Sequence, residues 1–392
     1  MKRVLIISLA YFPRKGGAEI AIKEITDRIS AQDIAFDLVT LRFDAKDLSV
    51  ERVGNMQVYR IQSLGSGRVG KFLFEFLAAI QALRLHQKFH YDAVWSMMAH
   101  SAGVPGAIFK FFNPRVPFIL TLQEGDPPEH VERVMRPLWL FFASAFRRAD
   151  IVQPISNFLG TWARRRGFRG PLPVIPNGVD LKNFAKTFSE QERDAFKTKL
   201  KKKEGEVFLI TTSRLVRKNA IDDVIRALAF LPENIRFLIL GIGSEEETLR
   251  ALARGLGVDE RVQFVGFVDH CDMPLYLSVS DIFIRPSRSE GMGNSFIEAM
   301  AAGLPVIATQ EGGISDFLFD AKRNPDKVAT GWAVSRDNPE QIAEAVQEIL
   351  RDKEATQRVI ENARNIAAQY DWDKIARDMR TCVFDAAFSQ AK

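Results

Sequence analysis

The segment Arg285–Thr309 contains a glycine-bearing loop, a helix and a strand, and it directly follows an apolar run that ends at Arg285. An alanine-rich stretch predicts the helix over Phe296–Ala302. Gly303 suits the left-handed position that ends a helix, and Pro305 prevents the helix from continuing. The next apolar run, Val306–Thr309, predicts a second strand. Two strands joined through a helix run parallel in one sheet, so this segment strongly constrains the fold.

The same alternation of strands and helices extends along the chain. The first half predicts helices and strands at residues 19–30, 36–41, 58–61, 72–85, 93–96 and 118–122. The pattern begins again with a strand over Phe208–Thr212 and another over Arg236–Leu240. Alternating strands and helices predict parallel sheets with helices on both faces. Because 392 residues are too many for one core, we predict two α/β domains.

A segment rich in proline and glycine, from Gly167 to Asp180, predicts the domain boundary, because both residues disfavour continued helices and strand ladders. We therefore assign residues 1–175 to an N-terminal domain and residues 176–370 to a C-terminal domain. Residues 371–392 form a terminal helix. Asp371-Trp-Asp373 has the spacing of a metal-binding motif, but it begins this helix and is better explained as a cap with dipole-complementing charge. We expect no catalytic metal.

Composition excludes several classes of protein. Two distant cysteines, Cys271 and Cys382, predict no disulfide framework and fit a reducing cytoplasm. The apolar run Val4–Ala10 is followed by Pro13 and by charged residues without a cleavage site, so it predicts a buried strand rather than a signal peptide. No strongly apolar run approaches the roughly 20 residues that span a bilayer. We expect a cytoplasmic protein that is not integral to the membrane.

Positive charge is concentrated in the first half of the chain. Residues 1–175 hold 24 Lys+Arg and 15 Asp+Glu, and several of these cations lie beside aromatic residues, as in Arg136-Pro-Leu-Trp-Leu-Phe-Phe. This mixture suits peripheral binding to the anionic inner face of the plasma membrane. An ordinary solvated face over a buried stripe explains it equally well. We expect no nucleic acid partner, because the sequence contains no finger, RNP-like motif or basic recognition helix.

Two carboxylates bracket the glycine-bearing loop. Glu290 enters the loop and Glu298 lies inside the helix that follows it. Free backbone N–H groups and the positive end of the helix dipole suit a phosphate or diphosphate there. A carboxylate beside a phosphate favours hydroxyl groups as partners, such as those of a sugar or ribose. Glu298 has a second interpretation, because Ser295-Phe-Ile-Glu298 also matches a capping box.

The pattern Ser-x-x-Glu-Gly-x-Gly-Asn-x-x-x-Glu-Ala-Met-Ala-x-Gly-x-Pro-Val-Ile-Ala resembles the E-x7-E segment of glycosyltransferase family 4. These are retaining enzymes of the GT-B fold, in which two Rossmann-like α/β/α domains face each other across a cleft. The resemblance implies that Glu290 lies by the transferred sugar and that Glu298 binds the ribose. It also implies that the donor diphosphate is held by the loop residues Gly291, Met292, Gly293, Asn294 and Ser295. In relatives, the terminal helix crosses back to the first domain.

Four other segments resemble the same family. Gly16 and Gly17 match the first glycine loop of the family. A second segment, Gly266, Phe267 and Val268, matches the part of the family whose backbone reads the nucleobase. Arg214 and Lys218 match the cations that stabilise the departing diphosphate, although strict counting aligns the lysine with Asn219. Gln123 stands where many relatives have a histidine that faces the sugar. Gln can hydrogen-bond a hydroxyl but cannot accept a proton near neutral pH. Among the histidines, only His100 is a candidate for a place near the cleft, and a packed or hydrogen-bonded position is favoured for it.

The resemblance implies a retaining glycosyltransferase that uses a nucleoside diphosphate sugar, needs no cofactor and acts on a glycan or lipid-linked acceptor. The resemblance implies that such an enzyme acts in cell-surface polysaccharide or glycolipid biosynthesis. Two alternatives remain. A sugar-nucleotide epimerase shares the fold, and a non-catalytic partner protein would fit the loss of histidine at Gln123. A dinucleotide-dependent enzyme is disfavoured, because Glu246 replaces the third glycine of the fingerprint that begins at Gly241.

Overall fold

The computed structural model describes residues 1–62 and 67–390, which form two compact units. One unit comprises Met1–Gly178 and Trp372–Lys392, and the other comprises Val179–Asp371. These boundaries lie three residues and one residue beyond the predicted ones at 175 and 370. Asn177 belongs to the first unit because it bonds Gln123 there (2.8 Å). Gly178 belongs there too, because its backbone lies against the ring of Trp372 and leaves no room for a Cβ atom.

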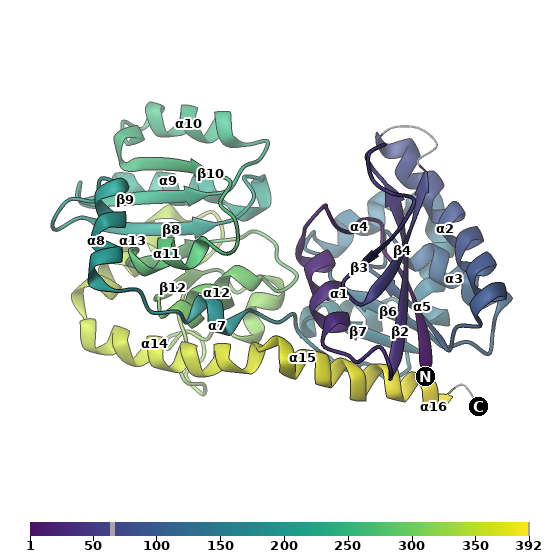
Figure 1. Cartoon of the computed structure of the whole chain (residues 1–392). Helices are drawn as coiled ribbons and strands as arrows, with labels where there is room; N and C mark the ends of the chain where they lie inside the picture. Colours follow the sequence, from purple (N-terminus) through teal and green to yellow (C-terminus); the bar gives the residue numbers. More distant parts are fainter. Residues whose placement is uncertain (63–66, 391–392) are drawn as a thin grey trace. The chain divides into compact units, whose positions relative to one another are not determined.

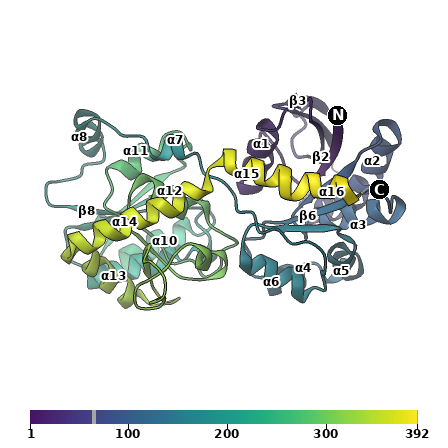
Figure 2. The ribbon, with the colours of Figure 1, turned by 90° about the horizontal axis from the view of Figure 1, so that it is seen from below.

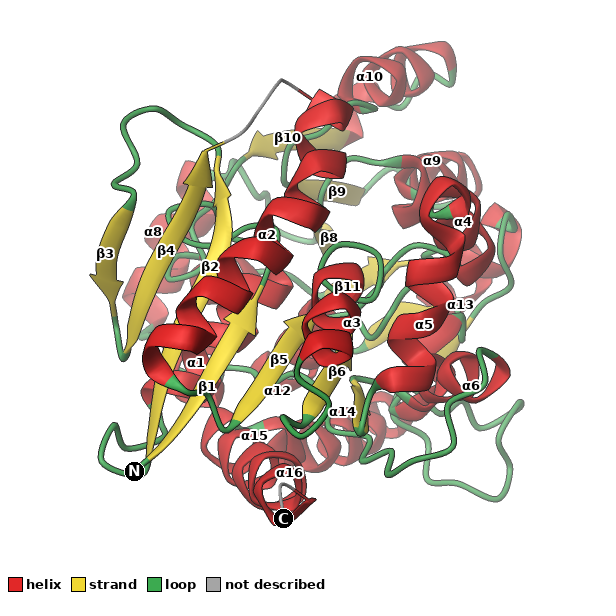
Figure 3. Ribbon diagram, turned by 90° about the vertical axis from the view of Figure 1, so that its right-hand side faces the viewer, coloured by secondary structure: helices red, strands yellow, loops and turns green. Residues whose placement is uncertain are grey.

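The first unit contains a seven-stranded sheet in the order β3-β4-β2-β1-β5-β6-β7 (Figure 3). Its strands are β1 (Lys2–Ile7), β2 (Ile34–Arg42), β3 (Val50–Val53), β4 (Met56–Gln62), β5 (Ala93–Met97), β6 (Phe118–Leu122) and β7 (Ile151–Pro154). All neighbours are parallel except β3 and β4, which form an antiparallel hairpin. The sequence analysis missed β3, because this edge strand has only four residues and none of them is buried.

Helices cover both faces of this sheet. In Figure 3, three helices lie in front of the strands, namely α2 (Gly67–Phe89), α3 (Gly103–Phe112) and α5 (Trp139–Arg148). The other face packs against α1 (Gly17–Asp27) and the C-terminal segment, which consists of α15 (Trp372–Asp378), a π-helical turn (Met379–Phe384) and α16 (Asp385–Gln390). Figure 2 shows α15 beside α1. The last residues of the chain therefore complete the core of the first unit.

The second unit contains a parallel six-stranded sheet in the order β10-β9-β8-β11-β12-β13 (Figure 1). Its strands are β8 (Val207–Thr212), β9 (Ile235–Leu240), β10 (Val262–Gly266), β11 (Ile282–Arg285), β12 (Val306–Ala308) and β13 (Trp332–Ala333). One face packs against α9 (Ile221–Ala227), α10 (Glu246–Gly255) and α13 (Pro339–Arg351). A second group of helices packs together, namely α7 (Leu181–Phe184), α8 (Glu190–Lys199), α11 (Met273–Ser278), α12 (Asn294–Ala302) and α14 (Lys353–Ala367). Two parallel-sheet α/β units were predicted, and the structure confirms them.

Each sheet reverses its strand order once. In the second unit the chain moves outward from β8 through β9 to β10 and then returns to place β11 on the other side of β8. In the first unit the reversal lies between β1 and β5. Open parallel sheets bind ligands beyond the carboxyl ends of their strands at such a reversal, because the two flanking loops diverge there. The two reversals are therefore the candidate ligand sites of the two sheets.

A substitution at Phe384 tests whether the C-terminal segment stabilises the core of the first unit. Its ring is fully buried and meets Phe36 and Trp95 edge-on, with centroids 5.8 and 5.3 Å away. Phe384→Ala is expected to destabilise the first unit by about 3–5 kcal/mol, because it leaves a cavity in the core. Calorimetric unfolding measures this change. Cys382→Ala, an exposed change on the same segment, is the control, and equal effects of the two changes would refute the packing role.

Candidate functional site

The predicted cations lie in the loop after β8, at the strand reversal of the second unit. Arg214 is exposed, and Lys218 is partly buried in a 3-10 turn over Arg217–Asn219. Asn219, the alternative to Lys218 by strict counting, is buried, and its side chain donates to the carbonyl oxygen of Arg214 (2.7 Å). Asn219 therefore shapes the loop, and Lys218 remains the candidate cation.

Two glycines after β9 explain how this loop is held. A Cβ atom at Gly241 would lie 1.9 Å from the carbonyl oxygen of Ser213, and one at Gly243 would lie 2.2 Å from that of Leu215. The backbones are close enough for Leu215 N–H to donate to Ile242 (3.0 Å). These glycines are therefore needed for the close approach of the two loops.

The loop after β11 forms the other side of the reversal. Helix α12 begins at Asn294, two residues earlier than predicted, and Gly293 is its N-cap with φ of 95°. No side chain caps this helix. The capping-box interpretation of Ser295 and Glu298 is therefore wrong. Ser295 lies inside the first turn, and its hydroxyl accepts a hydrogen bond from Arg285 (2.7 Å) instead.

Arg285 is a buried cation that the sequence analysis did not single out. One guanidinium nitrogen donates to Ser295 and to the carbonyl oxygen of Thr212 (3.3 Å), and another donates to Glu290 (3.0 Å). The guanidinium also lies over the ring of Phe296, 4.2 Å from its centroid. Burial lowers the pKa of Arg285 from its usual value, while the charges of Glu290 and Glu298 oppose that change. In this structure Glu290 is thus an ion-pair partner of Arg285.

Glu298 is bonded to a histidine that the sequence analysis missed. Nε2 of His270 lies 3.0 Å from Oε1 of Glu298, and the Glu298 side chain is 11% exposed. The hydrogen bond to Glu298 raises the pKa of His270, burial lowers it, and nearby Asp180 and Asp269 add to the rise. No local pattern could have revealed this pair, because the two residues are 28 positions apart.

Arg288 joins the two loops of the reversal. Its backbone N–H donates to the carbonyl oxygen of Lys218 (2.7 Å), and its side chain donates to that of Arg217 (2.8 Å). The guanidinium also bonds Asp222 (2.9 and 3.0 Å) and Asp223 (3.0 and 3.1 Å) at the start of α9. Burial, and then the charge of Asp222, raise the pKa of Asp223 to about 6.

The loops after β10 and β12 also lie at the carboxyl edge of this sheet. Gly266 has φ of 85°, Phe267 is 73% exposed and Val268 is buried, all at the end of β10. After β12, Gly312 has φ of 62°, and a Cβ atom there would lie 1.9 Å from the carbonyl oxygen of Glu290. Gly313 N–H donates to that same oxygen (3.1 Å). The backbone around Glu290 is therefore held from outside its own loop.

Several buried polar atoms at this edge have no hydrogen-bond partner within the described part of the chain. They belong to the ends of β8 and β11 and are Thr211 Oγ1, Ser213 Oγ, Arg285 Nε and Ser287 Oγ. Buried polar groups are normally satisfied, so their concentration at the strand reversal is consistent with a site that receives polar ligand atoms or water.

The first unit carries the other predicted residues. Gly16 precedes α1 and Gly17 begins it. Burial raises the pKa of nearby Glu19, and hydrogen bonds from the backbone N–H groups of Glu19 and Gly16 oppose this rise. Gln123 is buried, and its side-chain amide pairs with that of Asn177 at 2.8 and 3.4 Å. Gln123 is therefore committed to a protein partner.

His100 follows β5 at the reversal of the first sheet. Its Nδ1 lies 3.3 Å from Glu124 Oε1, which also accepts the backbone N–H of Ala99 (2.6 Å). The sequence analysis expected His100 near the cleft or in a packed, hydrogen-bonded position. The structure shows the hydrogen bond to Glu124.

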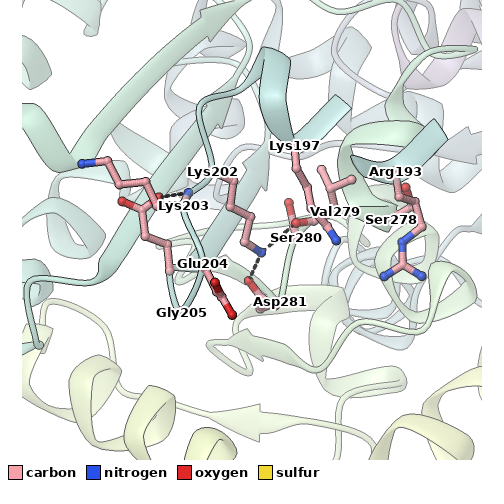
Figure 4. A pocket seen from close by; sticks show the side chains of 11 residues that line it. Arg193, Lys197, Lys202, Lys203, Glu204, Gly205, Ser278, Val279, Ser280 and Asp281 are labelled. Carbon is pink, nitrogen blue, oxygen red and sulfur yellow. Dashed lines mark hydrogen bonds and ion pairs between the residues drawn. The ribbon is translucent and has the colours of Figure 1, made fainter. Parts of the chain in front are cut away.

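A separate cavity of about 430 Å³ lies at the opposite edge of the second sheet (Figure 4). It is lined by residues that precede β8 and β11, among them Lys202 and Asp281. Lys202 Nζ is 2.6 Å from Asp281 and 3.0 Å from the carbonyl oxygen of Val279. Because this ammonium group is already paired and the cavity is at the amino ends of the strands, it is a poor candidate for the ligand site. No cluster of metal-ligating side chains occurs in residues 1–62 and 67–390.

Comparisons with known proteins agree with this architecture. Residues 15–183 match the family described as "Glycosyltransferase Family 4", and residues 192–366 match "Glycosyl transferases group 1". HepE from Anabaena, solved with UDP and glucose, superimposes with a TM-score of 0.79 at 21% identity, covering 98% of this chain and all of HepE. The fold is GT-B. The chain belongs to glycosyltransferase family 4.

Two relatives illustrate the range of the family. A GDP-mannose-dependent alpha-(1-6)-phosphatidylinositol monomannoside mannosyltransferase from Mycobacterium tuberculosis is 30% identical over 59% of this chain and 62% of its own length. An alpha-monoglucosyldiacylglycerol synthase from Acholeplasma laidlawii is 25% identical over 82% of this chain and 83% of its own length. The first curated relatives that the chain matches are covered over only 52% and 62% of their own length.

Arg288 provides a test of the joined loops. Arg288→Ala is expected to lower the free energy of unfolding by about 1–3 kcal/mol, because it leaves the carboxylate of Asp223 without its cation. Arg226→Ala is a matched control, since Arg226 pairs with the neighbouring Asp222 (3.1 Å) but is 44% exposed, and its loss should cost at most about 0.5 kcal/mol. Denaturant titration measures both changes. An Arg288 effect as small as that of Arg226 would contradict the proposed link.

Proposed function

We propose that this chain is a retaining, metal-independent glycosyltransferase that moves a sugar from a nucleoside diphosphate sugar to a glycan or lipid-linked acceptor. The observation that carries the proposal is the strand reversal between β8 and β11. There the cation-bearing loop of Arg214 and Lys218 and the start of α12 belong to adjacent strands of one sheet edge. The positive side chains of Arg214 and Lys218 and the positive end of the α12 dipole therefore lie at one sheet edge, which suits the diphosphate of a donor.

For the other residues we propose the roles that the family resemblance implies. Backbone N–H groups of Gly291–Ser295 would hold the diphosphate, Glu298 would accept the ribose hydroxyls, and Glu290 would lie beside the transferred sugar. The backbone at Gly266–Val268 would contact the nucleobase. Gly16, Gly17 and Gln123 of the first unit complete the proposed set, with Gln123 acting through the amide pair that it forms with Asn177.

In the proposed reaction, the bond between the anomeric carbon and the diphosphate oxygen breaks as the acceptor oxygen bonds to the same face of that carbon. The acceptor proton passes to the leaving diphosphate oxygen, so no protein nucleophile is required. Negative charge on the diphosphate grows during this step, and Arg214 and Lys218 stabilise it. Catalysis would then come mainly from electrostatic preorganisation and positioning.

The names of the relatives favour a lipid-linked or polysaccharide product. Two are named for the synthesis of lipid glycosides, one of them from GDP-mannose, and HepE was solved with UDP and glucose. We accordingly place this chain in cell-surface polysaccharide or glycolipid biosynthesis, at the cytoplasmic face of the membrane.

An exposed apolar and basic face of the first unit supports membrane association. Leu140 and Phe141 on α5 are 77% and 43% exposed, and Phe111 on α3 is 60% exposed with Arg148 5.0 Å from its ring centroid. Phe141 also packs edge-on against Phe76 of α2. No helix in residues 1–62 and 67–390 is long and apolar enough to cross a bilayer.

The function is tested first with nucleotide sugars. A screen for thermal stabilisation identifies the donor, because a ligand at about 100 times its dissociation constant adds roughly 2.7 kcal/mol. Product analysis then follows with and without acceptor. Transfer that requires the acceptor and retains anomeric configuration supports the proposal. Epimerised donor formed without acceptor indicates the epimerase alternative, and no turnover of a bound donor indicates a non-catalytic partner.

The proposed cations are tested by steady-state kinetics. Arg214→Ala and Lys218→Ala are each expected to lower turnover by about 10²–10³ while raising the donor KM much less, because they stabilise charge that develops in the transition state. Arg214→Lys should turn over as slowly as Arg214→Ala, because only arginine can form a bidentate contact with the diphosphate. Lys218→Arg should be faster than Lys218→Ala, because a single positive charge is expected to suffice at that position. Arg254→Ala, an exposed change at the end of α10, is the control. Turnover near wild type in both alanine variants would place the leaving group elsewhere.

Membrane association is tested with vesicles. The protein is expected to sediment with anionic vesicles and to be released by salt, because screening limits charge interactions to about 8 Å at physiological ionic strength. Leu140→Ser should weaken sedimentation, since it removes apolar surface from the proposed contact. Phe230→Ser is the matched control, because Phe230 is 51% exposed in the second unit. Equal binding to neutral and anionic vesicles would refute this proposal.

A further inference from the structure

His270 is held in place by two helices of the second unit, α7 and α12. Its ring meets the buried ring of Phe184 edge-on, with centroids 4.8 Å apart, and its carbonyl oxygen accepts from the side chain of Asn183 (3.4 Å). Its Nε2 bonds Glu298 on α12. Helices α7, α11 and α12 pack against one another (Figure 1). His270 is nevertheless 45% exposed on its side chain, so it borders solvent.

The bond engages only one oxygen of Glu298. Within the described residues, His270 alone hydrogen-bonds this carboxylate, and it does so through Oε1. An ionised carboxylate has about four lone-pair positions on two oxygens. The arrangement therefore leaves Oε2 able to accept hydrogen bonds from a ligand, while Oε1 fixes the rotation of the side chain.

We propose that His270 is a positioning residue for the donor site, which holds Glu298 so that its second oxygen accepts the hydroxyl groups of the nucleoside ribose. This inference rests on the proposed function, because it assumes that Glu298 binds ribose. Nothing in the local sequence marks His270 for this role. The role comes from its contact with α12.

The charge of His270 has a second consequence. The groups that face it are Glu298 on α12, Asp180 at the start of α7 and Asp269 in its own loop, and all three are acidic. A protonated imidazole offsets the negative charge of Glu298, which favours a diphosphate nearby. The pKa of His270 is raised, so the protonated form persists to higher pH than in a free histidine. Donor affinity should then fall as pH increases through that pKa.

Calorimetric titration tests this inference with UDP, GDP and ADP as probes, and with the 2′,3′-dideoxy counterpart of the one that binds. His270→Ala should weaken binding of the ribonucleotide about tenfold, because one positioned hydrogen bond is lost. It should change binding of the dideoxy probe by less than about threefold. His270→Gln should restore most of the affinity and remove the pH dependence. His130→Ala, an exposed change on the first unit, is the control and should change nothing.

The outcomes are distinct. Equal weakening of both probes by His270→Ala would show a structural role only and overturn the inference. Unchanged affinity for the ribonucleotide would overturn it as well, while leaving the proposed function intact. If none of the three nucleotides binds the unaltered protein, the proposed function fails and the inference fails with it.

Discussion

The buried guanidinium of Arg285 is the interaction on which the candidate site depends. It lies at the end of β11 and joins three separate parts of the second unit, namely the last carbonyl of β8, the carboxylate of Glu290 and the first turn of α12. Removing a cation from water costs several kcal/mol unless its partners compensate. The loop is therefore stable only in the conformation that supplies those partners. The same conformation places the start of α12 at the strand reversal.

Much of this architecture is predictable from the sequence because it depends on local chemistry. Apolar strands alternating with helices predict the parallel sheets, and β6 occupies the predicted residues, Phe118–Leu122. Gly303 ends α12 in the left-handed conformation expected of it, with φ of 81°. The positions of Arg214, Glu290 and Glu298 along the chain match a known family pattern. Their placement at one sheet edge follows from parallel topology alone.

What the sequence could not show is which side chains pair. His270 and Glu298 are 28 residues apart, and Arg288 and Asp222 are 66 apart, so tertiary packing alone decides these contacts. The prediction of a capping box was wrong for a related reason. Ser295 matches the local motif, but Gly293 starts the helix earlier and Arg285 takes the serine hydroxyl. A buried cation nearby thus outweighed a local capping preference.

The return of the chain to its first unit has a consequence for synthesis. Residues Val179–Asp371 form the whole second unit, and they are made before the segment that supplies Trp372 and Phe384 to the core of the first. At typical translation rates of 5–20 residues per second, this delay is roughly 10–40 seconds. During that time one face of the first sheet lacks its final covering, while the second unit is being synthesised. The nascent chain therefore finishes its two units in the reverse of the order in which it begins them.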